Sequence, residues 1–436
     1  MTRRAARDGL LVVTGRIAFV ALWFIAILLV YRGLGQDEAG LAQAGLFAVA
    51  IAGVKIASGC IVDPGDLALM RRAPTLLRSD PAAAFALFRA AFALRLAMTA
   101  MVATALLAFA ALAGGGQAAT LVPLIGWIVV AILADALFRS VMVVLQAGER
   151  FAALVLLEGA LQVTRLLAIL VLWTGGWITV ERVLAAYCAS TLLITLAGGA
   201  LLLPRGILRP ATVRREDLGE LLAFLKWMVP AMMIAAVNER LDVMLVYALE
   251  GADAAGRYGA MATLAMTADI VAGSLSSVIQ PRIARMRADG SYGANLRLFL
   301  SFSVPVAVLA LAMALMLAAP VVGLVLGQRY VPGVPVFLWL LAGTLFWLAV
   351  TPLPLAMVAI HAPSLAVAVT LCQTVLVAVV GLALLATNGI VGMAQGICIT
   401  RIGVALLLLA FGQRLSHGKE APGFGAGGAS CREAGR

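Results

Sequence analysis

Charged residues are scarce in this sequence. Lys, Arg, Asp and Glu together make up 12% of its 436 residues, whereas 63% are hydrophobic. A soluble domain carries roughly 25% charged residues, and an apolar excess of this size cannot be enclosed in one water-soluble core. The composition therefore excludes an ordinary soluble enzyme and predicts surfaces that face lipid.

Reactive side chains are also few. The two histidines, His361 and His417, leave almost nothing for a His-based triad or a metal cluster. The five cysteines are scattered without ligand spacing, which supports neither a disulfide framework nor a zinc site. The sequence contains no P-loop, HExxH, GxSxG or dinucleotide-binding fingerprint. We therefore expect no cofactor and no enzyme activity.

What the sequence has in abundance is long apolar runs. Lipid offers no hydrogen-bond partners, so the backbone groups of a spanning segment must pair within a helix or a closed barrel. The apolar runs are near 20 residues long and lack strand-like alternation, which favours helices over a barrel. The first run follows three arginines, has no small-residue cleavage site, and is predicted to be an uncleaved helix. We predict an all-α integral membrane protein with about twelve spans, near 11–33, 40–62, 87–113, 119–145, 151–174, 180–203, 222–249, 256–281, 296–319, 333–359, 363–386 and 390–412.

The net charge of +11 has a topological explanation. Arginines and lysines gather in alternate predicted loops, such as 71–78, 205–215 and 282–287, while the opposite loops hold only Arg32, Arg182, Arg257 and Arg329. This asymmetry follows the positive-inside rule, so we expect both termini in the cytoplasm and no nucleic-acid partner.

Two segments half a chain apart are similar. Residues 30–62, beginning Val30-Tyr31, align without gaps on residues 246–278, beginning Val246-Tyr247, at a shift of 216. Each segment opens a predicted six-helix half, and an even number of helices inserts both halves the same way up. We predict two pseudo-symmetric lobes around a central cavity, an N-lobe over 1–208 and a C-lobe over 209–415, with a disordered tail over 416–436.

Ionisable residues inside the apolar spans are the candidate functional residues. Each would cost about 2.5–3.5 kcal/mol if it faced lipid, so each is expected to face a bundle interior or cavity. Cations come from both halves, and a shared cavity would attract an anion such as a phosphate or diphosphate. These cations are Arg16, Lys55, Arg139, Arg165, Arg240 and Arg401. The acids Glu239, Asp242 and Asp269 are the candidates for a coupling proton or sodium ion.

Structural roles stay open for several of these residues. Arg139 stands four residues after Asp135, and the two could form an ion pair on one helix face. The long side chains of Arg16 and Lys55 could instead snorkel, placing their charged ends at the membrane–water interface. The prolines Pro230, Pro352 and Pro354 predict kinks, which serve either gating or static packing.

The sequence around the seventh span resembles a known family. It reads Phe224-Leu-Lys-Trp-Met-Val-Pro230, then Asn238-Glu-Arg-Leu-Asp242, then Gly256-Arg-Tyr258-Gly-Ala260, and reaches Pro281. This resembles the polysaccharide and O-antigen flippases of the multidrug/oligosaccharidyl-lipid/polysaccharide exporter superfamily. In that family, a Pro-kinked helix with an Asp near its middle precedes a Gly-x-Tyr-x-x-Ala segment. The Gly, Tyr and Ala of the present sequence match the spacing of that segment only approximately.

The resemblance implies a protein of the bacterial inner membrane that flips an undecaprenyl-diphosphate-linked oligosaccharide by alternating access. Its partners would be the lipid bilayer, that cargo, a proton or sodium ion, and the polysaccharide polymerase machinery of O-antigen and lipopolysaccharide export. Two alternatives stay open. A drug/cation antiporter of the same superfamily would want a cavity of acids and aromatics. An integral-membrane glycosyltransferase or polysaccharide polymerase would want a sizeable external loop.

Overall fold

The computed structural model describes residues 3–36, 38–112, 115, 119–208, 215–268, 292–350 and 363–416. Apart from short turns these residues are helical, as the all-α prediction requires. The first half contains α1 (Arg3–Leu34), α2 (Glu38–Ile61), α3 (Asp63–Ser79), α4 (Pro81–Leu112), α6 (Val122–Ala147), α7 (Phe151–Thr174), α8 (Val180–Leu202) and η1 (Arg205–Leu208). The second contains α9 (Arg215–Asn238), α10 (Leu241–Glu250), an unlabelled helix over 252–268, α12 (Tyr292–Val325), η2 (Gln328–Gly333), α13 (Val334–Val350) and α15 (Pro363–Ser416).

The helices agree with the predicted twelve crossings. Within the described residues, ten segments are long and apolar enough to cross a membrane. One of them, Ala368–Leu407, turns back on itself at Gly389, whose φ is 58°. Gly381 packs against Met393 and Gly396 across this turn, so the segment is an antiparallel pair of helices. The eighth predicted span begins as the helix over 252–268, and its remainder lies outside the described residues.

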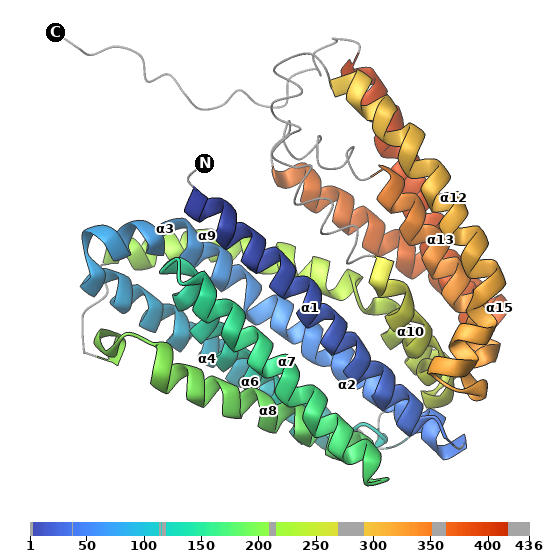
Figure 1. The fold of residues 1–436 in the computed structure, drawn as a ribbon, viewed down its shortest axis with the longest axis horizontal. Helices are drawn as coiled ribbons and strands as arrows, with labels where there is room; N and C mark the ends of the chain where they lie inside the picture. The colour runs from blue at the N-terminus through green and yellow to red at the C-terminus, as the bar shows by residue number, and fades with distance from the viewer. Residues whose placement is uncertain are drawn as a thin grey trace.

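The helices form two bundles that meet at one end (Figure 1). One bundle contains α1, α2, α4, α6, α7 and α8, and the other contains α10, α12, α13 and α15. They approach each other where α1 runs into α2, and they separate toward the end where α1 begins. α9 runs beside the first bundle and leads to α10 in the second. The arrangement is a V, with the helices from α1 to α8 in one arm and those from α10 to α15 in the other.

The polar stretch after the second predicted span, expected as a loop, is a helix. Asp63 and Asp66 lie in the first turn of α3 with Pro64 between them, and Arg78 lies in the last turn. This pattern suits the helix dipole and the open amides of a helix start. Its buried side chains, which include Leu69, pack with α4, α6 and α9. α3 therefore connects the first bundle to the beginning of α9.

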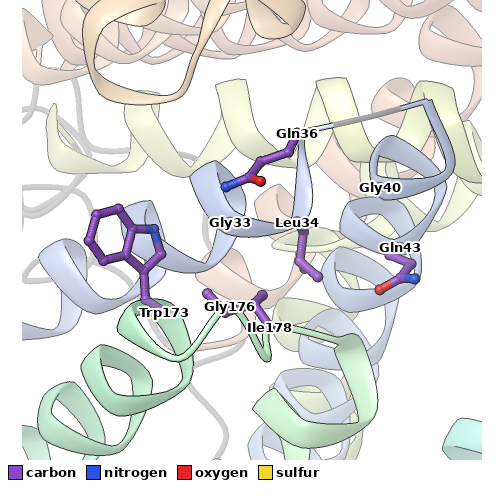
Figure 2. Close-up of a pocket in the computed structure, with 8 residues that line it drawn as sticks. All are labelled: Gly33, Leu34, Gln36, Gly40, Gln43, Trp173, Gly176 and Ile178. Atoms are coloured by element: carbon purple, nitrogen blue, oxygen red, sulfur yellow. The ribbon is translucent and has the colours of Figure 1, made fainter.

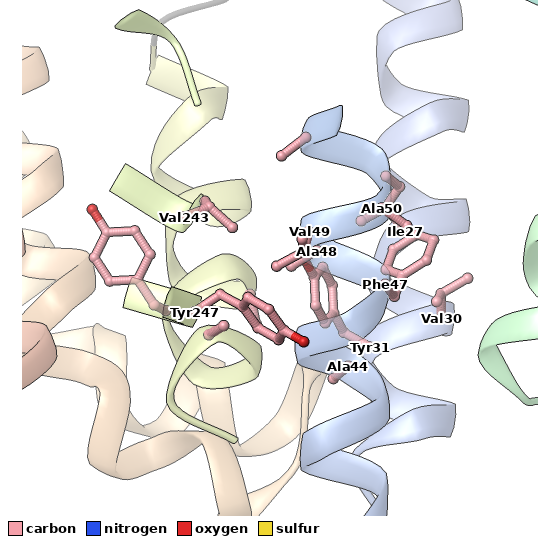
Figure 3. Packing of buried hydrophobic residues seen from close by; sticks show 14 of the residues in the cluster. Ile27, Val30, Tyr31, Ala44, Phe47, Ala48, Val49, Ala50, Val243 and Tyr247 are labelled. Carbon is pink, nitrogen blue, oxygen red and sulfur yellow. The ribbon is translucent and has the colours of Figure 1, made fainter. Parts of the chain in front are cut away.

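Glycines allow the two halves to touch at the closed end of the V. A Cβ at Gly45 of α2 would collide with the Ala252 carbonyl oxygen, and one at Gly256 would collide with that of Leu41. Side chains would hold these backbones apart, so glycine is required on both sides. Figure 3 shows α10 beside α2, with Val243 and Tyr247 in the same buried cluster as the alanines of α2. The two segments of the predicted repeat thus cross here.

Hydrogen bonds join the halves at the same end. The Tyr330 hydroxyl donates to the Tyr31 carbonyl oxygen at 3.0 Å, and the two rings meet edge to face. The hydroxyls of Thr120 and Tyr247 share a hydrogen bond of 2.6 Å. Tyr31 and Tyr247 are equivalent positions of the repeat, so each half contributes a tyrosine to a contact with the other. We call these contacts the tyrosine seam.

A methyl group at the glycine crossing should destabilise the protein. We expect Gly45→Ala to lower the stability by about 1–3 kcal/mol, because overpacking forces backbones apart, and to reduce the monodisperse fraction in detergent. Gly53→Ala on the same helix is the matched control, since its new Cβ would lie 3.8 Å from Met244 Cε, an ordinary contact. Thermal unfolding of both purified variants measures the difference. Equal melting temperatures would contradict a tight crossing.

Candidate functional site

The seventh predicted span is interrupted near its middle. α9 ends at Asn238, residues 239 and 240 form a turn, and α10 starts at Leu241. The Arg240 amide donates to the Val237 carbonyl at 3.0 Å, a tighter turn than in an α-helix. Inside a membrane, an interrupted helix is tolerated only where protein or water satisfies the freed backbone groups. The break must therefore be buried in protein or line a water-filled cavity.

A cavity beside the break lies in the second half and has a volume of about 360 Å³. Residues of the break, of the helix over 252–268, of α13 and of α15 line it. They are Asn238, Glu239, Arg240, Asp242, Val243, Ala262, Ala265, Met266, Leu340, Thr344, Gln373, Val377, Ile397 and Arg401. We call it the C-lobe cavity. It brings together four of the residues predicted from the sequence: Arg240, Arg401, Glu239 and Asp242.

The two arginines are held differently. Arg401 donates a hydrogen bond to the Thr344 hydroxyl. Arg240 Nη1 lies 3.3 Å from the Met266 sulfur, a weak acceptor, and its buried Nε has no hydrogen-bond partner in the protein. The buried Oδ1 of Asn238 also has none. An unsatisfied donor and acceptor in one polar cavity are the groups that a ligand or water would satisfy.

Asp242 is fixed by two donors. The Tyr258 hydroxyl donates to Oδ2 at 2.9 Å, and the Val243 amide donates to Oδ1 at 2.8 Å. Tyr258 is completely buried. These are the Asp and the Tyr on which the sequence resemblance depends, so that motif joins the start of α10 to the helix over 252–268.

A second cationic pocket lies in the first half between α1, α2, α7 and α8. Arg165 is 9% exposed, stacks 3.7 Å over the Tyr187 ring, and donates to the Thr191 hydroxyl at 2.7 Å. Its Nε and the Oε1 of Gln162 are buried without partners. Lys55, an exposed residue, also lines this pocket of about 40 Å³, together with Trp23. We call it the N-lobe pocket.

Arg139 belongs to neither cavity. It pairs with Asp63 at 3.0 Å and with Asp66 at 2.9 Å, both at the start of α3, and these acids take the place of its expected partner Asp135. Arg95 of α4 joins the same group, 2.6 Å from Asp66 and 4% exposed. Sequence reasoning missed Arg95, although an arginine inside the apolar run 81–112 is the same signal that found the others.

The remaining candidates are only partly placed. Pro230 lies inside α9, before the break at 239–240 rather than at it. Arg16 lies in α1, but its side chain is outside the described structure, as are the residues Asp269, Pro352 and Pro354. The six predicted cations therefore do not share a single cavity among the described residues: two line the C-lobe cavity, two line the N-lobe pocket, and Arg139 forms ion pairs.

Solved structures of transporters have this fold. An inward-facing multidrug resistance MATE transporter of the MOP superfamily matches with a TM-score of 0.72 and 14% identity over 91% of this chain and 94% of that one. The lipid II flippase MurJ, in an inward closed conformation, matches at 0.70 and 13% over 93% and 87%. A MOP superfamily transporter from Pyrococcus furiosus, described as having a binding pocket of reversed polarity, matches at 0.61 and 15% over 94% and 95%. The chain thus has the fold of multi-pass MOP-superfamily transporters.

Sequence comparison identifies the family. A family model described as polysaccharide biosynthesis protein matches residues 76–335, more than half of the chain. The chain belongs to this polysaccharide biosynthesis family, which confirms the resemblance drawn from the sequence. Comparison with curated proteins gives no match.

The Asp242 site yields a stability test. We expect Asp242→Asn to unfold at nearly the wild-type temperature, because an amide can still accept from the Val243 amide and bond to the Tyr258 hydroxyl. Asp242→Ala leaves that buried hydroxyl unpartnered and should cost about 1–3 kcal/mol. Thermal unfolding in detergent compares the two. Equal losses in both variants would contradict the hydrogen-bonding role.

Proposed function

We propose that this protein flips an oligosaccharide linked to a polyprenyl diphosphate across the bacterial inner membrane, by alternating access, for export of surface polysaccharide such as O-antigen. The supporting observation is that Arg240 and Arg401 line one cavity at an interrupted helix, in a member of a polysaccharide biosynthesis family. The cargo joins an apolar tail, a charged diphosphate and a polar glycan. Its transporter therefore needs a cationic, hydrated path with an opening toward lipid.

The cations suit the diphosphate. A guanidinium offers several donors in a planar fork, which matches two phosphate oxygens. Arg240 and Arg165 each keep a buried Nε without a protein partner, so each has a donor to offer. In the open V, the C-lobe cavity and the N-lobe pocket belong to opposite arms, and we infer that the diphosphate is bound by cations of both arms.

The open end of the V faces the cytoplasm in this proposal. α1 begins at that end, and the positive-inside rule assigns the N-terminus to the cytoplasm. The two arms would be an N-lobe over 1–208 and a C-lobe over 209–415, with both termini inside. Cargo would enter between the arms and leave after the tyrosine seam opens.

Acids beside the arginines are proposed to couple transport to an ion. Glu239 is exposed to the C-lobe cavity, and Asp242 lines it while bound to Tyr258. Carboxylates within a membrane are the usual carriers of a proton or sodium ion. Binding of that ion beside Arg240 would change the charge that the cargo meets. A driving ion gradient would then favour one direction of lobe movement.

Charge reversal in the C-lobe cavity should abolish transport. A phosphate about 4 Å from an arginine is attracted by about 4 kcal/mol in a partly buried site, and a glutamate would repel it. We expect Arg240→Glu or Arg401→Glu to reduce surface polysaccharide by more than about tenfold at unchanged protein level. Immunoblots of polysaccharide and protein measure both quantities. The control is Arg329→Glu, at an exposed arginine outside the cavity; normal export by both cavity variants would refute the anionic cargo.

Deletion of the gene should leave the cargo on the wrong side. We expect lipid-linked oligosaccharide to accumulate on the cytoplasmic face of inverted vesicles from the deletion strain, and complementation to reverse this. Enzymatic labelling of vesicles of both orientations measures the distribution. Loss of drug resistance without accumulation would identify an antiporter instead.

The proposed topology has its own test. Reporter fusions at Gly176 and at Arg209 should report opposite sides of the membrane, with Arg209 in the cytoplasm. Alkaline phosphatase and fluorescent-protein reporters give complementary signals. The same side for both positions would overturn the arrangement of the lobes.

A further inference from the structure

A polar pocket lies at the closed end of the V, one helical turn beyond the lining of the N-lobe pocket along α1, α2 and α7. It has a volume of about 220 Å³ and lies between the end of α1, the start of α2 and the turn from α7 to α8 (Figure 2). Its lining residues are Gly33, Leu34, Gln36, Gly40, Gln43, Trp173, Gly176 and Ile178. We call it the outer pocket.

The chain shapes this pocket with a tight turn. α7 ends at Thr174, and Gly176 has a φ of 67°, which favours glycine. The turn places Ile178 against Gly33, where a Cβ would collide with the isoleucine side chain. Thr179 then caps α8 by accepting from the Arg182 amide. Trp173, 38% exposed, lies on the α7 side of the pocket, and Figure 2 shows Gln36 and then Gln43 farther across it.

The lining chemistry selects a neutral ligand. None of the eight described residues that line the pocket carries a charge, in a chain with a net charge of +11. The amides of Gln36 and Gln43 each offer two donors and an acceptor, as hydroxyl-rich ligands require. An indole offers a large apolar face with a polar edge. Amides that bind hydroxyls beside an aromatic face that packs on C–H groups suit a pyranose ring.

The position relates the pocket to the tyrosine seam. Gly35 follows the lining residue Leu34 directly, and a side chain on Gly35 would overlap the Tyr330 ring. Tyr330 in turn donates its hydrogen bond to the Tyr31 carbonyl oxygen. The outer pocket and the seam therefore share the last turn of α1. A ligand in the pocket lies beside the contact that must open for cargo to leave.

We propose that the outer pocket binds a neutral sugar ring of the cargo glycan on the exit side of the membrane. This inference rests on the proposed function and adds to it a binding site for the glycan, separate from the cations that bind the diphosphate. Bound sugar would hold the glycan outside while the diphosphate and the lipid tail follow.

The test separates the glycan from its lipid. The probe is the free oligosaccharide released by mild acid from the polyprenyl-diphosphate-linked pool of the host strain. It is titrated against the full chain in nanodiscs and followed by saturation-transfer NMR. We expect the wild type to bind it, and Trp173→Leu and Gln43→Ala each to weaken binding by at least tenfold, because an aromatic or hydrogen-bonded contact is removed.

A matched control lies in the same turn. Trp177 is 57% exposed and does not line the pocket, so Trp177→Leu should bind the glycan as the wild type does. No binding to a monodisperse wild type, or equal binding by Trp173→Leu and Gln43→Ala, would overturn the outer pocket as a sugar site. The vesicle assay distinguishes the two proposals: cargo accumulation in the deletion strain without glycan binding refutes this pocket alone, whereas no accumulation refutes the flippase.

Discussion

Lipid offers no partners for backbone hydrogen bonds, and the rest of this structure depends on that constraint. Several turns between the described helices use glycines with positive φ, such as Gly176, Gly251 and Gly389. The turn within the seventh span is different. It contains Glu239 and Arg240, with φ of −135° at Arg240, and it lies beside a polar cavity. Charged residues in a helix break, with no glycine to ease the turn, fit a site for an ion or an anionic group.

Contacts at the two ends of the V differ in kind. At the closed end the halves meet through glycine backbones, alanines and tyrosines. Toward the other end, ion pairs bind α3 to its own bundle, where Asp66 lies between Arg95 and Arg139. Buried ion pairs add little net stability, but removal of one partner is costly. Arg32 also joins the halves at the closed end, where it donates to the Leu324 carbonyl oxygen at 2.7 Å. The ion pairs of α3, by contrast, lie within one half of the chain and keep α3 in place.

Much of the fold could be predicted from the sequence, because each membrane-spanning segment must by itself be apolar and long enough to cross the bilayer. Hydropathy located the spans, and Gly389 divides the last apolar segment where a boundary was expected. The cost of a charge in lipid identified Arg240, Asp242 and Arg401 one residue at a time. Which of them share a cavity depends on helix rotation and packing. Arg139 shows the limit, because its partners come from α3, a helix that the polar composition did not reveal.

The outer pocket shows a second limit. Its residues come from two distant stretches of chain, 33–43 and 173–178. Neutral glutamines and a tryptophan carry no energetic penalty in lipid that would distinguish them in a sequence. The Asp242–Tyr258 contact could be anticipated only through the family resemblance. Sixteen residues separate the two, and they come into contact only because the chain turns at Gly251. The free-energy cost of a charge in lipid identifies charged site residues from the sequence. Neutral site residues are identified only from the tertiary structure.

The first turns of α9 are attached to the other half of the chain. Glu220 bonds to Arg72, Phe224 lies under Arg71, and Leu221 is buried with residues of α3 and α4. Beyond the break, α10 packs against α15. A ligand bound at residues 238–242, as proposed, would lie where two bodies join, and its affinity would depend on the angle between them. By thermodynamic reciprocity, the factor by which closure changes that affinity equals the factor by which the bound ligand shifts closure. A ligand that bound the open and the closed state with equal affinity would not shift the equilibrium between them, however tightly it bound.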